Sequence, residues 1–164
     1  MTRKTNAMRL LDSHRIRYQV HEFSTEIRSA REVAEVLGVH PSQVYKTLVV
    51  TRERGRPLLV LISGDHVLDL KRLAQAVGEK RLHMAAHREA EALTGLRVGG
   101  ISALSLIRKG FTVYVDESIL AQEKIYVSAG RRGINLSLLP NDLIQVTNAH
   151  VSRLTVPNTS EGKE

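Results

Sequence analysis

The sequence has no cysteine, no tryptophan and few other aromatic residues, with two phenylalanines and four tyrosines among 164 residues. Without cysteine, disulfide bonds, thiolate zinc sites and cysteine nucleophiles are all excluded. The aromatic content of 4% predicts an aliphatic core and argues against a platform on which several bases stack. The chain is therefore poor in side-chain chemistry, which suits a reaction whose substrate supplies the reactive group.

Long apolar runs are also missing. No stretch approaches the ~18 residues that a membrane-spanning helix requires, and the polar N-terminus lacks the apolar segment of a signal peptide. We therefore expect a cytoplasmic protein with no membrane partner. The sequence contains neither a G-x-x-x-x-G-K-[ST] loop nor a G-x-S-x-G motif, which argues against a P-loop NTPase and an α/β-hydrolase.

Signals for a metal site are weak. His83 and His87 have the i, i+4 spacing of a zinc-binding helix, but no H-E-x-x-H motif and no third ligand accompany them. The other histidines are scattered, and none of them stands in a convincing pair with a carboxylate. We expect neither a metal nor a cofactor.

Charge and composition point to a globular protein with a polyanionic partner. The formal net charge is +7, and such an excess favours nucleic acid, although the basic residues are dispersed in pairs. The chain length, with 42% hydrophobic and 25% charged residues, predicts one domain with its own core. We place this domain at residues 1–154 and a polar C-terminal tail, which we expect to fray, at residues 155–164.

Hydrophobic periodicity predicts a mixture of helices and strands. Ser29 and Glu32 form an S-x-x-E capping box before an amphipathic helix that Gly38 can end, and residues 69–78 carry similar helix signals. The nearly all-apolar segment 57–62 predicts a strand buried on both faces. Further helices are expected at 5–13 and 85–93, and further strands at 17–23, 43–51, 112–115, 124–128 and 134–138. Because strands outnumber helices and connections are short, we expect a single α/β (α+β) domain with a mixed sheet.

Lys46 is the one charged residue in the expected strand 43–51. Alternation of side chains places it on one face with Val44, Leu48 and Val50, so its ammonium group has apolar neighbours. A buried and unpaired ammonium group is costly, and we therefore expect an anionic partner or an open cleft beside it. A lysine that extends from a sheet edge into solvent is the alternative interpretation.

The glycine-rich segment 95–105 (GLRVGGISALS) lies between a helix-like segment and an apolar stretch that we expect to be a strand. The Gly99–Gly100 pair has no Cβ atoms, so a ligand can approach the backbone closely and meet its N–H groups. Such N–H groups can stabilise a developing oxyanion or bind a phosphate. An ordinary turn is the alternative interpretation.

Three segments occur in the order VYKTLVV (44–50), GLRVGGIS (95–102) and IYVSAGRRG (125–133). Together they resemble the YbaK/EbsC family of aminoacyl-tRNA editing deacylases, with a likeness that runs over residues 7–149. The resemblance implies a curved, barrel-like mixed sheet surrounded by helices. It also implies a trans-editing deacylase that clears Cys from mischarged Cys-tRNA(Pro), with tRNA(Pro) and prolyl-tRNA synthetase as partners. The cysteinyl thiol would attack its own ester, while the protein supplies position and an amide cradle.

The resemblance assigns roles to particular residues. It implies that Lys46 anchors the 3′ end of the tRNA and that backbone N–H groups of the glycine-rich segment hold the ester carbonyl. The implied catalytic set is Lys46, Gly99, Gly100, Ile101 and Ser102. The implied substrate-binding set is Phe23, Tyr45, Ser128, Gly130, Arg131, Arg132 and Asn135, of which the two arginines can contact phosphate.

Four positions depart from the family pattern. Ala103 and Ser105 stand where the family usually has Pro and Gly, and Phe23 stands where the Cys-clearing branch has Tyr. Asn135 replaces an Asp, so it can hydrogen-bond but cannot act as a base or as a counter-ion for Lys46. These departures leave two alternatives open: a deacylase for another small amino acid such as alanine, or a weakly catalytic tRNA-binding module that docks with prolyl-tRNA synthetase.

Overall fold

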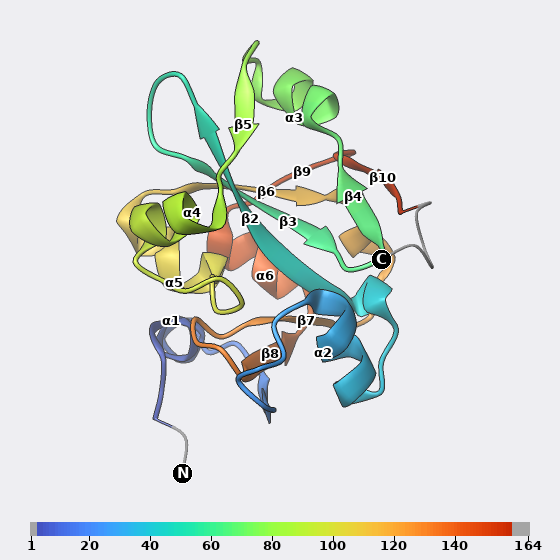
Figure 1. The fold of residues 1–164 in the computed structure, drawn as a ribbon. Coiled ribbons are helices and arrows are strands. Elements are labelled where there is room, and N and C mark those ends of the chain that lie inside the picture. Colours follow the sequence, from blue (N-terminus) through green and yellow to red (C-terminus); the bar gives the residue numbers. More distant parts are fainter. Residues whose placement is uncertain (1–2, 159–164) are drawn as a thin grey trace.

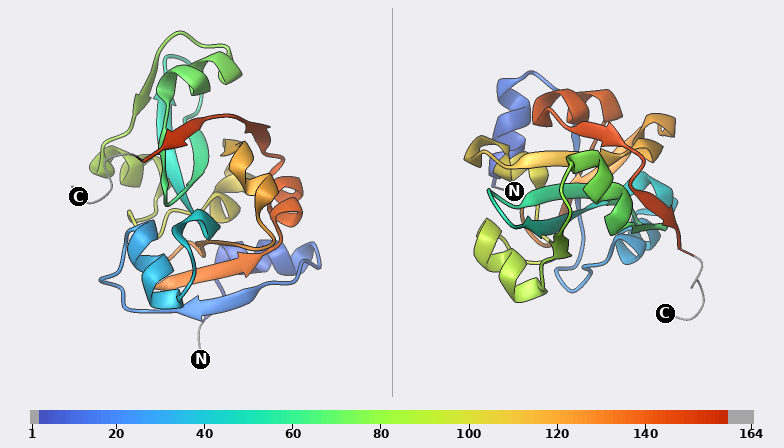
Figure 2. Two further views of the ribbon diagram at one scale, coloured as in Figure 1. Left: turned by 90° about the vertical axis from the view of Figure 1, so that its right-hand side faces the viewer. Right: turned by 90° about the horizontal axis from the view of Figure 1, so that it is seen from above.

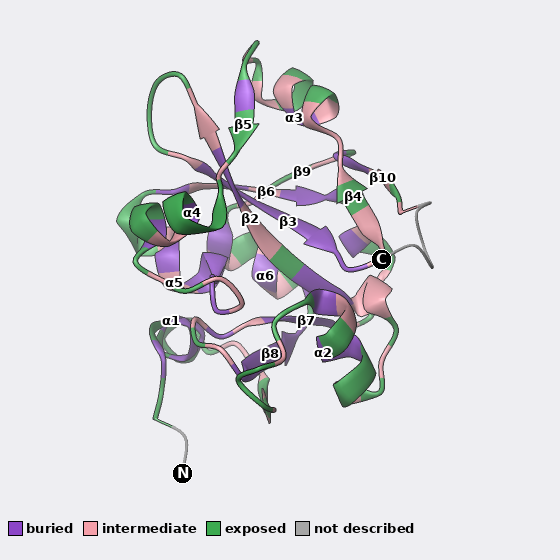
Figure 3. Cartoon of the chain, viewed as in Figure 1, coloured by how far each residue is buried: buried purple, intermediate pink, exposed green. Residues whose placement is uncertain are grey.

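Strand β3 (Leu58–Ser63) lies in the middle of the sheet, and all six of its residues are buried in the computed structural model, which describes residues 3–158 (Figure 3). Its residues alternate between two hydrophobic clusters, because successive side chains of a strand point to opposite faces. Leu59 and Leu61 join the larger cluster, whereas Leu58, Val60 and Ile62 join the smaller one. The strand buried on both faces, predicted from its apolar run, is confirmed.

The main sheet is mixed and has eight strands (Figure 1). The strand order is β1-β8-β7-β2-β3-β6-β9, and β5 pairs with the outer part of β2. The pairs β2–β7, β3–β6 and β6–β9 are parallel, and the other pairs are antiparallel. The remaining strands are β1 (Gln19–Glu22), β2 (Val44–Arg52), β5 (Leu82–Met84), β6 (Thr112–Asp116), β7 (Ile125–Ser128), β8 (Ile134–Leu138) and β9 (His150–Ser152).

Six α-helices surround the sheet within residues 3–158. The capping box of Ser29 and Glu32 is present, and Gly38 ends that helix in the left-handed conformation at φ +70°, as predicted. Helix α2 packs on β2, α3 packs on β5, and α1 and α6 both pack on α5 (Figure 1). The helices are α1 (Asn6–Ser13), α2 (Ala30–Leu37), α3 (Leu70–Val77), α4 (His87–Thr94), α5 (Ala103–Leu106) and α6 (Pro140–Thr147), and short 3₁₀ helices η1, η2 and η3 cover Pro41–Gln43, Ile107–Lys109 and Glu117–Ala121.

The sheet joins distant parts of the chain without closing. Strands β1 and β8 lie side by side, although they come from opposite ends of the sequence (Figure 2, left). The order begins at β1 and ends at β9 with no pairing between them in the described part of the chain, so the expected barrel-like shape is a curved, open sheet. No helix within residues 3–158 is long and apolar enough to cross a membrane.

Two parts of the structure differ from the prediction. The end of the glycine-rich segment forms helix α5, which was not predicted, and the Ser102 hydroxyl caps it by accepting the Ser105 N–H at 3.3 Å. The tail was expected to fray from Thr155, but β10 (Thr155–Pro157) pairs with β4 (His66–Leu68), and Thr155 is buried. A local pattern could not show this, because β4 is far away in the sequence. Residues 159–164 of the expected tail lie outside the described part of the chain.

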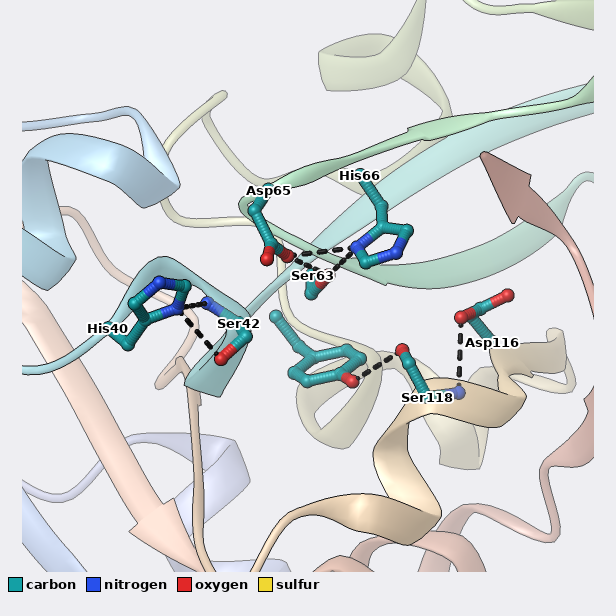
Figure 4. Close-up of polar contacts among 8 residues, drawn as sticks. His40, Ser42, Ser63, Asp65, His66, Asp116 and Ser118 are labelled. Carbon is teal, nitrogen blue, oxygen red and sulfur yellow. Dashed lines mark hydrogen bonds and ion pairs between the residues drawn. The ribbon is translucent and has the colours of Figure 1, made fainter. Parts of the chain in front are cut away.

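The carboxylate of Asp116 connects the C-terminal segment to the centre of the sheet, and Figure 4 shows its contact with Ser118. One oxygen accepts the N–H of Leu154 at 2.8 Å, and the other accepts the N–H of Ser118 at 3.1 Å. The Ser118 hydroxyl lies 2.7 Å from the Tyr45 hydroxyl on β2. Burial opposes ionisation of Asp116, but hydrogen bonds from Leu154 and Ser118 outweigh it and hold the pKa below its usual value. Asp116 therefore holds its neighbours as an ionised carboxylate.

We expect Asp116→Ala to lower the free energy of unfolding by about 2–5 kcal/mol at pH 7, because two N–H groups lose their acceptor. Since the pKa of Asp116 is lower in the folded chain than the roughly 3.9 of an unfolded one, its contribution is present above about pH 4 and is lost as the pH falls below that value. Urea denaturation at pH 7 and pH 3 should therefore show a larger effect of the substitution at pH 7. Glu117→Ala, which removes an exposed carboxylate next to it, is the matched control. An equal loss at both pH values would contradict the assignment.

Candidate active site

A cavity of about 510 Å³ lies beside β2, with lining residues from the start of α2, from α4 and from the glycine-rich segment. It brings together residues from five separate parts of the sequence. The predicted site residues that line it are Tyr45, Lys46, Gly99, Ile101, Ser128, Arg132 and Asn135. The other predicted residues are not part of its described lining, and these are Phe23, Gly100, Ser102, Gly130 and Arg131.

Lys46 reaches this cavity from the middle of β2 and is exposed, unlike Val44 and Tyr45 before it. Its neighbour across the strand pair is the buried Ile62. Because the side chain opens into a cleft, the ammonium group keeps access to water and avoids the cost of burial. Lys46 also lines a second cavity of about 440 Å³. The open cleft expected from the sequence is therefore present.

The glycine pair forms a tight turn at the wall of the cavity. The Gly100 N–H donates to the Arg97 carbonyl at 2.7 Å, and Gly99 has φ +91°, the left-handed conformation that the third position of a type II turn requires. A Cβ atom on Gly100 would lie 2.9 Å from the Arg132 backbone nitrogen, so close packing against residues 131–132 explains this glycine. Because the Gly100 N–H is already bonded, it is not available to a ligand.

Other amides in this turn remain available. Within the described residues, the N–H groups of Gly99, Ile101 and Ser102 donate no hydrogen bond. Gly99 and Ile101 line the cavity, and Ser102 directly precedes α5. Such amides can meet a carbonyl oxygen or an oxyanion. Of the four predicted residues of the segment, Gly99, Ile101 and Ser102 therefore keep an available N–H group, and Gly100 does not.

Glu91 on α4 and Arg132 both hold Val98, the second residue of the turn. The carboxylate of Glu91 accepts the Val98 N–H at 2.9 Å, and Nε of Arg132 donates to the Val98 carbonyl at 2.7 Å. The two side chains lie 4.0 Å apart. Glu91 was not singled out from the sequence, because nothing in the local pattern relates it to Val98. Arg132, expected to contact phosphate, is also part of the support for the turn.

Gly130 and Ser105 are packed against each other behind the cavity. Gly130 has φ +97°, and a Cβ atom at this position would lie 2.4 Å from the Ser105 hydroxyl oxygen. The Gly130 N–H donates to the Ser128 hydroxyl at 3.2 Å. The Ser105 hydroxyl is buried and has no hydrogen-bond partner within residues 3–158. The Ser105 side chain therefore occupies the space where a side chain of residue 130 would lie, so residue 130 has to be glycine.

Asn135 and Phe23, which also depart from the family pattern, differ in their position. Asn135 lies on β8, opposite His21 and Ser128 in the sheet, and it is buried while it lines the cavity. Phe23 donates its N–H to the Gly133 carbonyl at 2.9 Å, and its ring packs against the cluster around α2. Asn135 can therefore hydrogen-bond to a ligand, whereas Phe23 supports the loop 129–133. Arg131 is exposed.

Tyr45 is almost fully buried, and its hydroxyl is held by Ser118. Burial raises the pKa of Tyr45 to about 12, so the hydroxyl stays protonated. The residue thus positions the strand that carries Lys46, and it is also one of the residues that line the cavity.

A histidine–carboxylate pair that the sequence interpretation did not find lies in the turn between β3 and β4 (Figure 4). Nδ1 of His66 lies 2.9 Å from an Asp65 carboxylate oxygen and 2.9 Å from the Ser63 hydroxyl, which itself donates to Asp65 at 2.7 Å. Burial opposes ionisation of Asp65, but hydrogen bonds from Ser63 and His66 lower its pKa below the usual value. The adjacent residues Ser63, Asp65 and His66 could have signalled this cluster. The pair His83 and His87 is divided between β5 and α4, and no metal-binding group of three or more ligands occurs within residues 3–158.

We expect Glu91→Ala to raise the hydrogen-exchange rate of the Val98 amide by roughly 5- to 30-fold, because it removes the acceptor and about 1–2 kcal/mol of local stability. Glu91→Gln keeps an oxygen acceptor and should change the rate less. Exchange measured by NMR tests this, with Glu89→Ala as the control, since Glu89 is an exposed carboxylate on the same helix. Unchanged protection in Glu91→Ala would show that the turn is held without Glu91.

Residues 24–146 match the aminoacyl-tRNA editing domain family. The chain is 38% identical over 154 residues to EbsC of Enterococcus faecalis, named as a candidate Cys-tRNA(Pro)/Cys-tRNA(Cys) deacylase, and the match covers 93% of each chain. A crystal structure of a candidate trans-editing enzyme for prolyl-tRNA synthetase is similar with a TM-score of 0.78 at 28% identity, over 94% of this chain and 99% of that one. Proline–tRNA ligase of Aquifex aeolicus is 28% identical over 102 residues, which are 62% of this chain and 18% of the ligase.

The family match covers the strand of Lys46, the glycine turn and Asn135. All residues that line the cavity lie within it. The match to EbsC extends over nearly the full length of both chains. This chain belongs to the aminoacyl-tRNA editing domain family.

Proposed function

We propose that this chain is a trans-editing deacylase that removes cysteine from mischarged Cys-tRNA(Pro). The observation that carries the proposal is the convergence of Lys46 and the amides of the glycine turn on one cavity. That cavity is lined by the cationic groups of Arg28, Lys46 and Arg132, and Glu91 is the only carboxylate of its described lining. Such a balance suits the terminal phosphates of a tRNA. The names of EbsC and of the trans-editing enzyme support the same substrate.

The proposed roles follow from position. Lys46 binds a phosphate near the 3′ end and thereby orients the ester. The N–H groups of Gly99 and Ile101 hold the ester carbonyl oxygen, where negative charge develops in the transition state. The Asn135 side-chain amide is available to hydrogen-bond to the amino acid. Because Glu91 and Arg132 hold Val98 in place, the amides are oriented before the substrate binds.

The substrate supplies the nucleophile in this proposal, since the chain has no cysteine of its own. The sulfur of the cysteinyl side chain attacks its own ester carbon and forms a C–S bond. The bond from that carbon to the ribose oxygen breaks, and the ribose oxygen takes up a proton in place of the one that the thiol loses. The products are a thiolactone and tRNA with a free hydroxyl group. The protein contributes position and the amide cradle.

We expect Lys46→Ala to lower kcat/KM for Cys-tRNA(Pro) by about 10²-fold, the scale of a lost charge-assisted contact in a site. The melting temperature should stay close to that of the wild-type protein, because Lys46 is exposed and its loss leaves no hole in the core. Single-turnover deacylation and thermal unfolding measure both effects. Lys80→Ala removes an exposed lysine outside the cavity and serves as the control. A folded Lys46→Ala protein with wild-type turnover would place the site elsewhere.

We further expect tRNA(Pro) charged with serine to be a far poorer substrate than tRNA(Pro) charged with cysteine. The two differ by one atom and should bind almost equally, whereas the serine hydroxyl is a much weaker nucleophile than a thiol, which is roughly a few per cent thiolate at pH 7. The difference should therefore lie in kcat and not in KM.

Single-turnover assays with Cys-, Ser- and Ala-charged tRNA(Pro), together with trapping of the thiolactone, measure this difference. Equal rates for cysteine and serine, or cysteine that is released directly with no thiolactone trapped, would exclude attack by the thiol. A higher rate on Ala-tRNA would identify a deacylase for alanine. No turnover with any of the three, together with binding of tRNA, would identify a tRNA-binding module.

A further inference from the structure

A second cavity, of about 440 Å³, adjoins the first one on the other side of Lys46. The two cavities share part of their lining, namely Ser29, Ala30, Lys46, Leu48 and Met84. Gly64 brings the β3–β4 turn close to the start of α2, since a Cβ atom on Gly64 would lie 3.0 Å from the Cβ atom of Ala30. The second cavity therefore lies between α2 and the turn that carries His66, and a ligand extending from the first cavity past Lys46 enters it.

Two cationic side chains, those of Arg31 and Lys46, line the second cavity, and no carboxylate is present among its described lining residues. His66 adds a polar ring to the same lining. Its apolar lining comes from Leu48, Ile62 and Leu68 and the neighbouring Val67 and Met84. Cationic groups beside apolar side chains suit a ligand that has both a phosphate and a ring. The volume is within the range of small-ligand sites, which is about 300–1,000 Å³.

His66 is held in one orientation at this cavity. An ionised carboxylate can only accept hydrogen bonds, so the Asp65 oxygen 2.9 Å from Nδ1 places a proton on that nitrogen. Ser63, which is buried, holds the same carboxylate oxygen from the other side (Figure 4). The neutral ring then has an acceptor at Nε2, and this nitrogen remains for a ligand. Ribose hydroxyl groups and base amino groups are donors of the kind that it accepts.

We propose that the second cavity binds the nucleotide that precedes the aminoacylated one in the tRNA acceptor end. The phosphodiester that joins the two nucleotides lies at Lys46, which lines both cavities, and Arg31 adds a second positive charge. The ribose or base of the preceding nucleotide donates to Nε2 of His66 and packs on the apolar lining. This inference rests on the proposed function for the identity of the substrate, but the chemistry of the cavity assigns it to a nucleotide independently.

The test compares His66→Asn and Arg31→Ala with the wild-type chain. Asn can still donate to Asp65 through its amide nitrogen, so the β3–β4 turn keeps its support while the Nε2 edge is lost. His40→Ala and Arg54→Ala are matched controls, because neither residue lines either cavity, and both residues lie in other turns. Thermal unfolding confirms that all four variants are folded.

The first measurement is binding of the dinucleotide CpA and of adenosine alone by NMR titration. CpA should bind more tightly than adenosine to the wild-type protein, and each test variant should weaken CpA binding by on the order of tenfold, the scale of one polar contact to a charged group. Adenosine binding should not change. Equal affinity for CpA and adenosine, or CpA affinity unchanged in both test variants, would overturn the proposal.

The second measurement is deacylation of Cys-tRNA(Pro) and of cysteinyl-adenosine, which lacks the phosphodiester. Each test variant should raise KM for the tRNA by on the order of tenfold with kcat unchanged, and should leave the small ester unaffected, because only uniform binding is lost. A wild-type protein that binds CpA through His66 and Arg31 but deacylates no tRNA would leave the subsite standing and remove the proposed function. Active protein with wild-type KM in both test variants would remove the subsite.

Discussion

The burial of β3 on both faces is the constraint on which the rest of the structure depends. Five of its six residues supply side chains to two hydrophobic clusters, so elements must cover both faces of the sheet here. Its neighbour β2 shares this burial at Tyr45 and at Val49 and Val50, but not at Lys46. At Lys46 the strand is exposed, and both cavities lie there. A charged residue in an otherwise apolar strand is thus tolerated because the fold opens at that point.

Hydrogen bonds from side chains, some from distant elements and some from sequence neighbours, hold the site and the turns around it. Glu91 and Arg132 hold both polar groups of Val98, Asp116 holds the backbone at Ser118 and Leu154, and Ser63 and Asp65 hold His66. In each case a charged or buried group orients a turn. Hydrogen bonds of this kind are costly to leave unmade, so they keep one geometry. Amides that are held in place before a substrate arrives need little reorganisation when charge develops.

The glycines illustrate that a residue can fit a family pattern for a reason other than contact with a ligand. Gly100 is required because the backbone of residues 131–132 passes where its side chain would be, and its N–H is used within the turn. Gly130 is required because Ser105 occupies the corresponding space. These two glycines let three loops pack together, and Gly99 with Ile101 presents the amides to the cavity. Gly100 and Gly130 therefore serve the packing of the backbone, whereas their neighbours Gly99 and Ile101 offer N–H groups to the cavity.

Local features of the sequence determined the parts of the fold that depend on short-range forces. The capping box at Ser29, the left-handed Gly38 and the apolar run of β3 were all read correctly, because caps, positive φ angles and periodicity act over a few residues. Helix α5 was not predicted, since its four residues are too few to show a helical period and packing against α1 and α6 decides their conformation. The tertiary structure alone brought Glu91 to Val98, Thr155 to Leu68 and the imidazole of His66 beside the cavity of Lys46, because these contacts join residues whose separation along the chain carries no local signal.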